Sequence, residues 1–169
     1  MLSVANVRTA GGAANYFTAD NYYTRADADR SGEWVGQGAK ALGLDGRVEA
    51  KQFEAILKGY LPDGTRLGSD LRPHRAGTDL TFSMPKSWSL IALVGGDTRI
   101  LDAYAAAVKE TLGWAETHLA ETRMEVKGRE KIVPTRNLLV AMFGHDTNRN
   151  QEPNAHFHAV VANATHPPV

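Results

Sequence analysis

Residues 137–163, NLLVAMFGHDTNRNQEPNAHFHAVVAN, contain two apolar stretches that flank a polar loop. In the second stretch, period-two alternation puts His156 and His158 on the same strand face as the apolar residues that follow them, so the face that packs also carries two imidazoles. His145 closes the first stretch. A hairpin of the two strands would bring His145 opposite His156 and His158, and we expect the three side chains to converge.

Three imidazoles on a rigid sheet predict a metal site. Residues i and i+2 of a strand lie about 6.6 Å apart and point the same way. With no obvious fourth protein ligand, the ion would keep open coordination positions. Nitrogen ligands favour Zn, Mn, Fe, Co or Ni, and Mg or Mn becomes suitable where phosphate and water oxygens complete the shell. A cupin-type oxygenase would want a carboxylate soon after the HxH pattern, where this chain has AVVAN. Ordinary half-exposed strand histidines are the alternative.

The remaining pattern predicts strands and helices in mixed order. A strand at MLSVANVR is expected to end at Gly11–Gly12 and to be followed by a short helix through Tyr16. Two short amphipathic helices are expected at 33–43 and 48–59, each stopped by a glycine. Further expected elements are a strand at 78–83, a helix from Pro85, a long core helix capped by Asp97, and a hairpin of 122–128 with 129–135 that turns at Lys127–Gly128.

Two long polar segments interrupt these elements. Residues 18–32 are turn-rich, and residues 61–77 form a loop of about 17 residues, a length that suggests function or disorder. The stretch NYFTADNYY, residues 15–23, contains Tyr16, Tyr22 and Tyr23 in polar company. These tyrosines either pack against the surface or act chemically. A phenol, with a pKa near ~10, becomes a useful nucleophile only where a base or cation assists its deprotonation.

Two further features match such chemistry. Asp79 lies on the polar face of the strand at 78–83 and is a candidate carboxylate, or else an ordinary strand-start residue. SMPKSWS offers Ser83, Lys86, Ser87 and the free N–H groups of a helix start, which suit an anion. Alone, that motif is a plain helix start. Beside a metal and tyrosines, the anion that fits is a phosphodiester.

Composition limits the classes of function. The 169 residues suffice for one domain with a real core. There is no cysteine, which excludes disulfides, thiolate metal sites and a cysteine nucleophile. Nineteen basic and nineteen acidic residues give no global reason to expect nucleic acid, so DNA would bind through local patches. With no membrane-spanning run and no signal peptide, we expect a cytoplasmic protein.

Taken together, these motifs resemble the N-terminal relaxase domain of TrwC/TraI-type conjugative plasmid relaxases, in the HUH endonuclease superfamily. The resemblance spans essentially the whole chain, through MLSVANVRTAGGAANYF with the downstream NYY, GTDLTFSMPKSWSL, and residues 137–163. It implies an α+β fold with a central antiparallel sheet flanked by helices. Because such domains are longer, residues 1–169 would be a truncated version, the N-terminal portion of a larger relaxase or relaxase-helicase.

The resemblance also implies an activity. It implies metal-dependent nicking of single-stranded DNA at a plasmid origin of transfer by tyrosine transesterification, with a 5′-phosphotyrosine intermediate. Tyr16 would be the nucleophile, and Tyr22 or Tyr23 would serve a second transfer. Asp79 would support tyrosine deprotonation or orient a histidine.

The same resemblance assigns the metal ligands, while the phosphate contacts are inferred from the basic stretches, whose charges could otherwise be ordinary solvated ones. His145, His156 and His158 would bind a divalent ion, Mg or Mn, with Zn, Co or Ni able to replace it in vitro. Where many relatives have two adjacent tyrosines at the first position, this chain has Tyr16–Phe17. Phosphate contacts are expected at the SMPKSWS motif, in the basic stretches TRLGSDLRPHR and VKGREKIVPTR, and so at Ser83, Lys86, Ser87, Arg72 and Arg75.

The expected partners are single-stranded origin DNA, relaxosome accessory proteins and a coupling protein. We expect a monomer in the bacterial cytoplasm that is transferred with its DNA to the recipient cell. Two other functions stay open: a fragment that binds origin DNA without cutting it, and an unrelated three-histidine hydrolase of small substrates.

Overall fold

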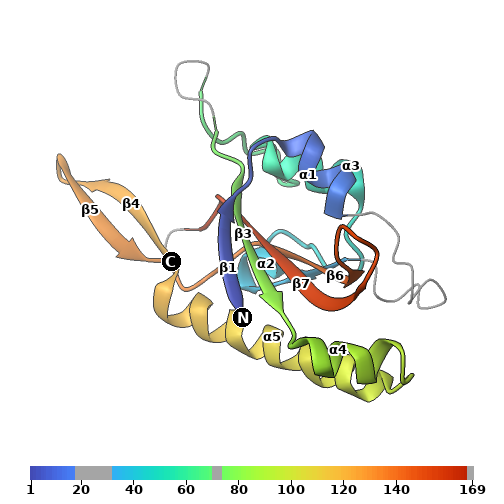
Figure 1. Ribbon diagram of the computed structural model, residues 1–169. Coiled ribbons are helices and arrows are strands. Elements are labelled where there is room, and N and C mark those ends of the chain that lie inside the picture. The colour runs from blue at the N-terminus through green and yellow to red at the C-terminus, as the bar shows by residue number, and fades with distance from the viewer. Residues whose placement is uncertain (18–31, 70–73, 167–169) are drawn as a thin grey trace.

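A five-stranded antiparallel sheet forms the centre of the protein (Figure 1). The computed structural model describes residues 1–17, 32–69 and 74–166, with backbone only at 14–17. The sheet order is β1-β3-β7-β6-β2, and β4 and β5 form a separate two-stranded sheet. Helices flank the sheet, which confirms the expected α+β class. No helix in the described ranges is long and apolar enough to cross a membrane.

The hairpin of β6 (Val140–Thr147) and β7 (Pro153–Ala162) forms the middle of this sheet. Its register pairs His145 with His156, and a shift between His145 and Thr147 inserts an extra residue in β7. The loop is shorter than the polar stretch suggested. The Asn148 carboxamide accepts hydrogen bonds from the backbone N–H groups of Asn150 and Glu152, which closes a tight turn.

Strand β3 (Gly77–Ser83) lies on the other side of β7, and β1 (Leu2–Asn6) forms the outer edge beyond it. The register of β3 with β7 puts Asp79 opposite Val160 and Thr81 opposite His158. Because partners across a ladder share a face, the polar side of β3 adjoins the histidine side of β7. This pairing joins segments that are nearly eighty residues apart in the sequence.

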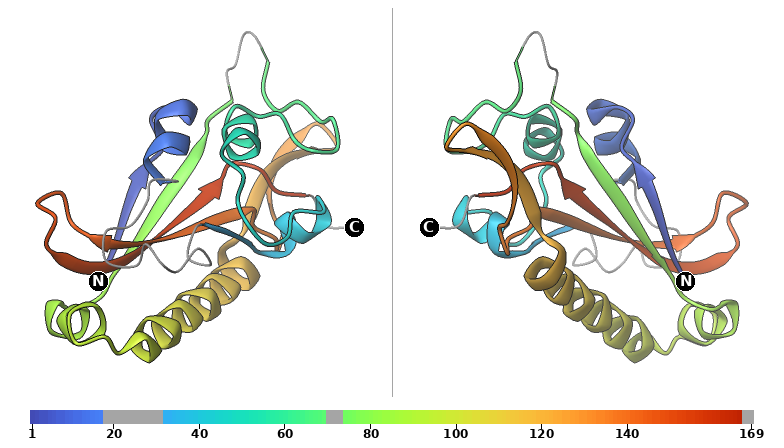
Figure 2. Two further views of the ribbon diagram at one scale, coloured as in Figure 1. Left: turned by 90° about the vertical axis from the view of Figure 1, so that its right-hand side faces the viewer. Right: turned by 90° about the vertical axis from the view of Figure 1, so that its left-hand side faces the viewer.

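Helices cover both faces of the sheet (Figure 2). On the histidine face, α1 (Ala10–Phe17) and α3 (Ala50–Leu57) pack through Ala13 and Phe53 against Phe143 and Val160. On the other face, α5 (Thr98–Leu119) packs through three buried residues of its apolar stripe, and α4 (Lys86–Leu93) continues that layer. The histidine face is therefore an interior face.

The prediction of one helix over 33–43 is wrong. Its first part is β2 (Glu33–Val35), in which Trp34 pairs with Ala141 at the edge of the sheet, and only then does α2 (Gln37–Ala41) begin. Gly36 separates the two with a φ of 103°, a conformation that a glycine adopts without strain. A Cβ there would also lie 2.3 Å from the Leu138 carbonyl oxygen.

Two predictions about where elements begin or end are also wrong. Gly11 and Gly12 do not end a strand, because β1 stops at Asn6 and both glycines lie inside α1. Gly11 instead permits close helix packing, since a Cβ there would lie 3.3 Å from the Glu54 carboxylate of α3. Asp97 occupies the N-cap position of α5 but makes no capping bond; its carboxylate accepts hydrogen bonds from Arg99 at 2.8 Å.

Strands β4 (Glu121–Val126) and β5 (Arg129–Pro134) form a ribbon that projects from the body (Figure 1). The expected turn at Lys127–Gly128 is confirmed, with φ values of 54° and 72°. Positive φ at both central residues is the geometry of a type I′ hairpin turn. The ribbon carries most of the basic stretch VKGREKIVPTR.

The aromatic contact under the sheet should dominate stability. Phe143 is 1% exposed and its ring lies 5.2 Å from that of Phe53. Phe143→Ala is expected to lower the free energy of unfolding by about 3–5 kcal/mol, measured by urea denaturation. Ile132→Ala, on the exposed ribbon, should change it by less than about 0.5 kcal/mol. Equal effects of the two variants would contradict this account of the core.

Candidate metal centre

His145, His156 and His158 converge at the centre of the inner sheet face. Their ring centroids lie 5.0–5.4 Å apart in all three pairs. One nitrogen from each ring can be chosen so that the three atoms lie within 4.8 Å of one another. Three nitrogens at this spacing can bind a single ion, and no cysteine or carboxylate is needed to complete the set.

Hydrogen bonds decide which nitrogen of two rings can act as a ligand. Nδ1 of His158 lies 2.8 Å from Oδ2 of Asp79, and Nδ1 of His156 lies 2.8 Å from the Asn154 carbonyl oxygen. Both partners are acceptors, so each Nδ1 carries the proton. In both rings Nε2 is left with its lone pair. This is the arrangement in which protein histidines normally bind a metal.

Burial of His156 favours the neutral, ligating form of its ring. His156 is 9% exposed, and burial lowers its pKa from the ordinary value. Asp79 is buried against His158, and its Oδ1 has no hydrogen-bond partner within the described residues. A buried carboxylate next to neutral imidazoles supplies negative charge, and a bound cation would compensate it.

Thr81 is a part of the site that sequence reasoning missed. Its hydroxyl donates to Oδ2 of Asp79 at 3.2 Å. The hydroxyl oxygen of Thr81 also lies 3.2 Å from Nδ1 of His158. The shared polar face of Asp79 and Thr81 was the available signal. Their common partner, His158, could not be predicted from the sequence, because the contact depends on the pairing of β3 with β7. The Asn154 carbonyl gave no signal, because any residue has one.

The other predicted residues are placed as follows. Tyr16 lies in the last helical turns of α1, and its side chain is outside what the structure describes. Tyr22, Tyr23 and Arg72 lie outside the described residues. Ser83 is opposite His156 in the ladder, so it borders the metal centre.

The SMPKSWS motif and Arg75 lie at opposite ends of β3. Lys86 begins α4 and forms an ion pair of 3.7 Å with Glu152 of the β6–β7 turn. Ser87 is exposed in the first turn of α4. Arg75 is exposed just before β3, away from the histidines. The structure thus brings Ser83 to the metal centre and leaves Arg75 remote from it.

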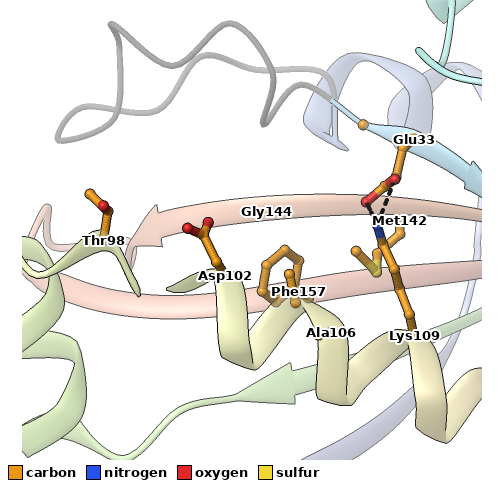
Figure 3. Close-up of a pocket in the computed structure, with 10 residues that line it drawn as sticks. Glu33, Thr98, Asp102, Ala106, Lys109, Met142, Gly144 and Phe157 are labelled. Carbon is orange, nitrogen blue, oxygen red and sulfur yellow. Dashed lines mark hydrogen bonds and ion pairs between the residues drawn. The ribbon is translucent and has the colours of Figure 1, made fainter. Parts of the chain in front are cut away.

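A cavity of about 610 Å³ occupies the opposite face of the sheet (Figure 3). Phe157 and Met142 line it from the strands, and Lys109 of α5 reaches across to Glu33 of β2 with an ion pair of 2.8 Å. Among the predicted site residues whose side chains the structure describes, none lines this cavity. Of the described residues, the three histidines, Asp79 and Ser83 lie on the other face of the sheet.

The donor set defines the class of protein. Three neutral imidazoles fit a divalent first-row metal, and open positions would admit phosphate and water oxygens, as Mg or Mn requires. The fold and the site together define an antiparallel-sheet protein with a three-histidine cluster that fits one divalent metal ion.

Comparison with known proteins gives the family. The family model for TrwC relaxase matches residues 10–168. The chain belongs to the TrwC relaxase family. It is 47% identical over 169 residues to the multifunctional conjugation protein TraI of Escherichia coli K12. The matched region covers 98% of this chain but only 10% of that protein.

Solved structures with the same fold include DNA complexes of the conjugative relaxase TrwC. A metal-bound complex with OriT DNA matches with a TM-score of 0.86 and 39% identity, over 98% of this chain and 57% of that one. A complex with a 27-mer DNA that comprises the recognition hairpin and the cleavage site matches with a TM-score of 0.83 and 38% identity. The match covers 98% of this chain and 56% of that one.

Removing one imidazole should abolish tight metal binding. In calorimetric titration with Co²⁺, we expect one site per chain and an affinity at least about 100-fold lower for His156→Ala, because two ligands remain. His118→Ala is the matched control, since His118 is exposed on α5 and stacks on Trp114. Equal Co²⁺ affinity of the two variants would show that the ion binds elsewhere.

Asp79→Asn should weaken the same site without destroying it. The amide oxygen can still accept the Nδ1–H bond from His158, but the negative charge is lost. Partners of metal-binding histidines typically contribute about 10–100-fold in metal affinity, and we expect a loss of that size in the same titration. Asp45→Asn, at an exposed loop position, is the control. An unchanged Co²⁺ affinity for Asp79→Asn would exclude this role.

Proposed function

We propose that this chain nicks and rejoins single-stranded DNA at a plasmid origin of transfer. The observation that carries the proposal is the three-histidine centre on the sheet face that α1 covers, with Tyr16 on that helix. Membership of the TrwC relaxase family and likeness to relaxase complexes with OriT DNA support it. The reaction exchanges one phosphodiester for another, so it is reversible.

Tyr16 is the proposed nucleophile. Its phenolate oxygen attacks the scissile phosphorus, the bond to the 3′ oxygen breaks, and a 5′-phosphotyrosine and a free 3′-hydroxyl result. The phenol proton leaves to solvent or a nearby base, and the 3′ oxygen takes up a proton. Phe17 offers no substitute hydroxyl, so the first transfer depends on Tyr16. Tyr22 or Tyr23 would serve the second transfer.

The three histidines would hold a divalent ion, which would supply positive charge to polarise the non-bridging phosphate oxygens. Mg or Mn is the proposed ion in the cell, with Zn, Co or Ni as in vitro substitutes. Asp79, held by Thr81, fixes the ring of His158 so that Nε2 faces the centre. Of the two roles expected for Asp79, orienting a histidine is the one that the hydrogen bonds support.

The DNA would be held by local cationic and polar groups, since the chain has equal numbers of basic and acidic residues. Ser83 borders the centre, and Lys86 with Ser87 begins α4 at the end of the hairpin. Arg72, Arg75 and the basic residues of the β4–β5 ribbon would contact phosphates farther along the strand. A two-stranded ribbon also fits a DNA major groove.

The chain spans about a tenth of the length of the curated relatives it matches and 57% of a relaxase chain in the solved complex. We infer that residues 1–169 are the N-terminal portion of a longer relaxase or relaxase-helicase. Its proposed partners are origin DNA, relaxosome accessory proteins and a coupling protein. It would act as a monomer in the bacterial cytoplasm and travel with the DNA.

A covalent adduct tests this function directly. With Mn²⁺ and a single-stranded origin oligonucleotide, we expect an SDS-stable protein–DNA band that Tyr16→Phe abolishes. Tyr104→Phe is the control, because Tyr104 lies on α5, on the sheet face opposite the histidines. An undiminished adduct with Tyr16→Phe would refute the nucleophile.

Two other outcomes would favour the alternatives. Binding of the oligonucleotide with no adduct would leave a DNA-binding fragment. Hydrolysis of a small ester that is lost in His156→Ala, with no effect of DNA, would favour a three-histidine hydrolase.

A further inference from the structure

A cavity of about 570 Å³ lies beside the α1–α3 layer, away from the metal centre. It is formed by the segment between β1 and α1, the end of α3, the loop after α3, and the residues that precede β3. Its rim is basic, and among the described residues that line it none is acidic. The basic residues of the rim are Arg8, Lys58, Arg66 and Arg75.

A folded loop that carries Arg66 forms one wall of the cavity. Gly59, with a φ of 88°, turns the chain where a Cβ would lie 2.9 Å from His74 and from the Leu67 carbonyl oxygen. The Leu67 N–H donates to the Gly59 carbonyl at 2.7 Å, which closes the loop. The Arg66 guanidinium lies 5.9 Å from the ring centroid of Tyr60, a cation–π distance. These contacts fold the loop wall of the cavity.

Charge at this cavity is only partly compensated. Lys58 forms an ion pair of 2.6 Å with Glu54. Within the described residues, no ion pair joins Arg8 or Arg75 to a carboxylate. Burial lowers the pKa of His74, so its imidazole is neutral near pH 7 and the positive charge comes from the arginines. Two uncompensated guanidinium groups at one cavity favour an anionic ligand.

The remaining lining indicates which anion. Val7, Leu57 and Ala76 give apolar surface, and Tyr60 is 52% exposed at the rim, where a base can stack. The volume is in the range of sites that bury a small organic molecule. A phosphate group with an attached sugar and base matches this combination of cation, apolar floor and aromatic ring.

The cavity is connected to the histidine cluster by β3 and to Tyr16 by α1. Ala76 lines the cavity and Thr81 contacts His158, five residues later, so about 16 Å separates them along β3. Ala10 lines it too, and Tyr16 follows six residues later in α1, about 9 Å along the helix. One extended DNA strand could occupy both places.

We propose that this cavity is a second anchor for the DNA strand, in which Arg8 and Arg75 bind backbone phosphates at a distance from the cleaved bond. The inference rests on the proposed function, because it takes the DNA from it. It adds a site that holds the strand without taking part in the chemistry. Its contribution should be independent of base sequence, since phosphates are the same in every sequence.

Salt dependence of DNA binding tests the anchor. Fluorescence anisotropy with a single-stranded origin oligonucleotide gives the slope of log affinity against log NaCl concentration. For the double variant Arg8→Ala/Arg75→Ala we expect the slope to fall by about 1.4, from about 0.7 per phosphate contact on single strands. Arg47→Ala/Arg99→Ala is the matched control, because both arginines are exposed elsewhere and the same charge is removed. Thermal melting checks that both variants fold.

Several outcomes would contradict the proposed DNA anchor. A slope equal to that of the control overturns the anchor, and so does a loss confined to the origin sequence. Millimolar inorganic phosphate or thymidine monophosphate is the second arm. Stabilisation of the unmodified chain by either, lost in the double variant while the DNA slope stays unchanged, would assign the cavity to a small phosphate compound and contradict a DNA anchor.

The anchor and the catalytic proposal can fail separately. A reduced slope together with no covalent adduct supports the anchor and contradicts nicking. An adduct with an unchanged slope supports nicking and contradicts the anchor. A chain that binds no oligonucleotide at all contradicts both.

Discussion

The register of β7 between β6 and β3 is the constraint on which the site depends. It sets His145 opposite His156 and Thr81 opposite His158, so three imidazoles and their polar partners share one face. A slip of one residue would turn every histidine of β7 to the other face, among the apolar contacts of α5. Apolar residues later in β7, such as Val160 beneath α1 and α3, resist that slip because they are buried on the same face.

Three imidazoles on an interior face would ordinarily destabilise a fold. Their cost is limited here because His158 donates to Asp79 and His156 donates to a backbone carbonyl. The bonds that satisfy the rings also fix the tautomers, so folding leaves the ligand nitrogens facing one another. A bound cation would add to the stability of this arrangement, because it binds the folded chain and not the unfolded one.

Much of the fold and part of the site could be predicted from sequence, for identifiable reasons. Alternation around His156 and His158 is a local signal, and so is the polar face that carries Asp79. The bond from His158 to Asp79 is not local, because it depends on a pairing between distant strands. The strand at Trp34 was missed because Gly36, which separates it from a helix, also fits inside a weak helical pattern. The basic cavity was missed because Arg8 and Arg75 meet only in three dimensions.

The central claim is that this register builds one metal centre from three histidines. Zinc K-edge X-ray absorption on the chain loaded with one equivalent of Zn²⁺ tests it most directly. We expect three imidazole nitrogens at about 2.0–2.1 Å, with oxygen ligands in the remaining positions, and two imidazoles in the His145→Ala variant. Fewer than three imidazoles in the unmodified chain, or an identical spectrum for His145→Ala, would contradict it.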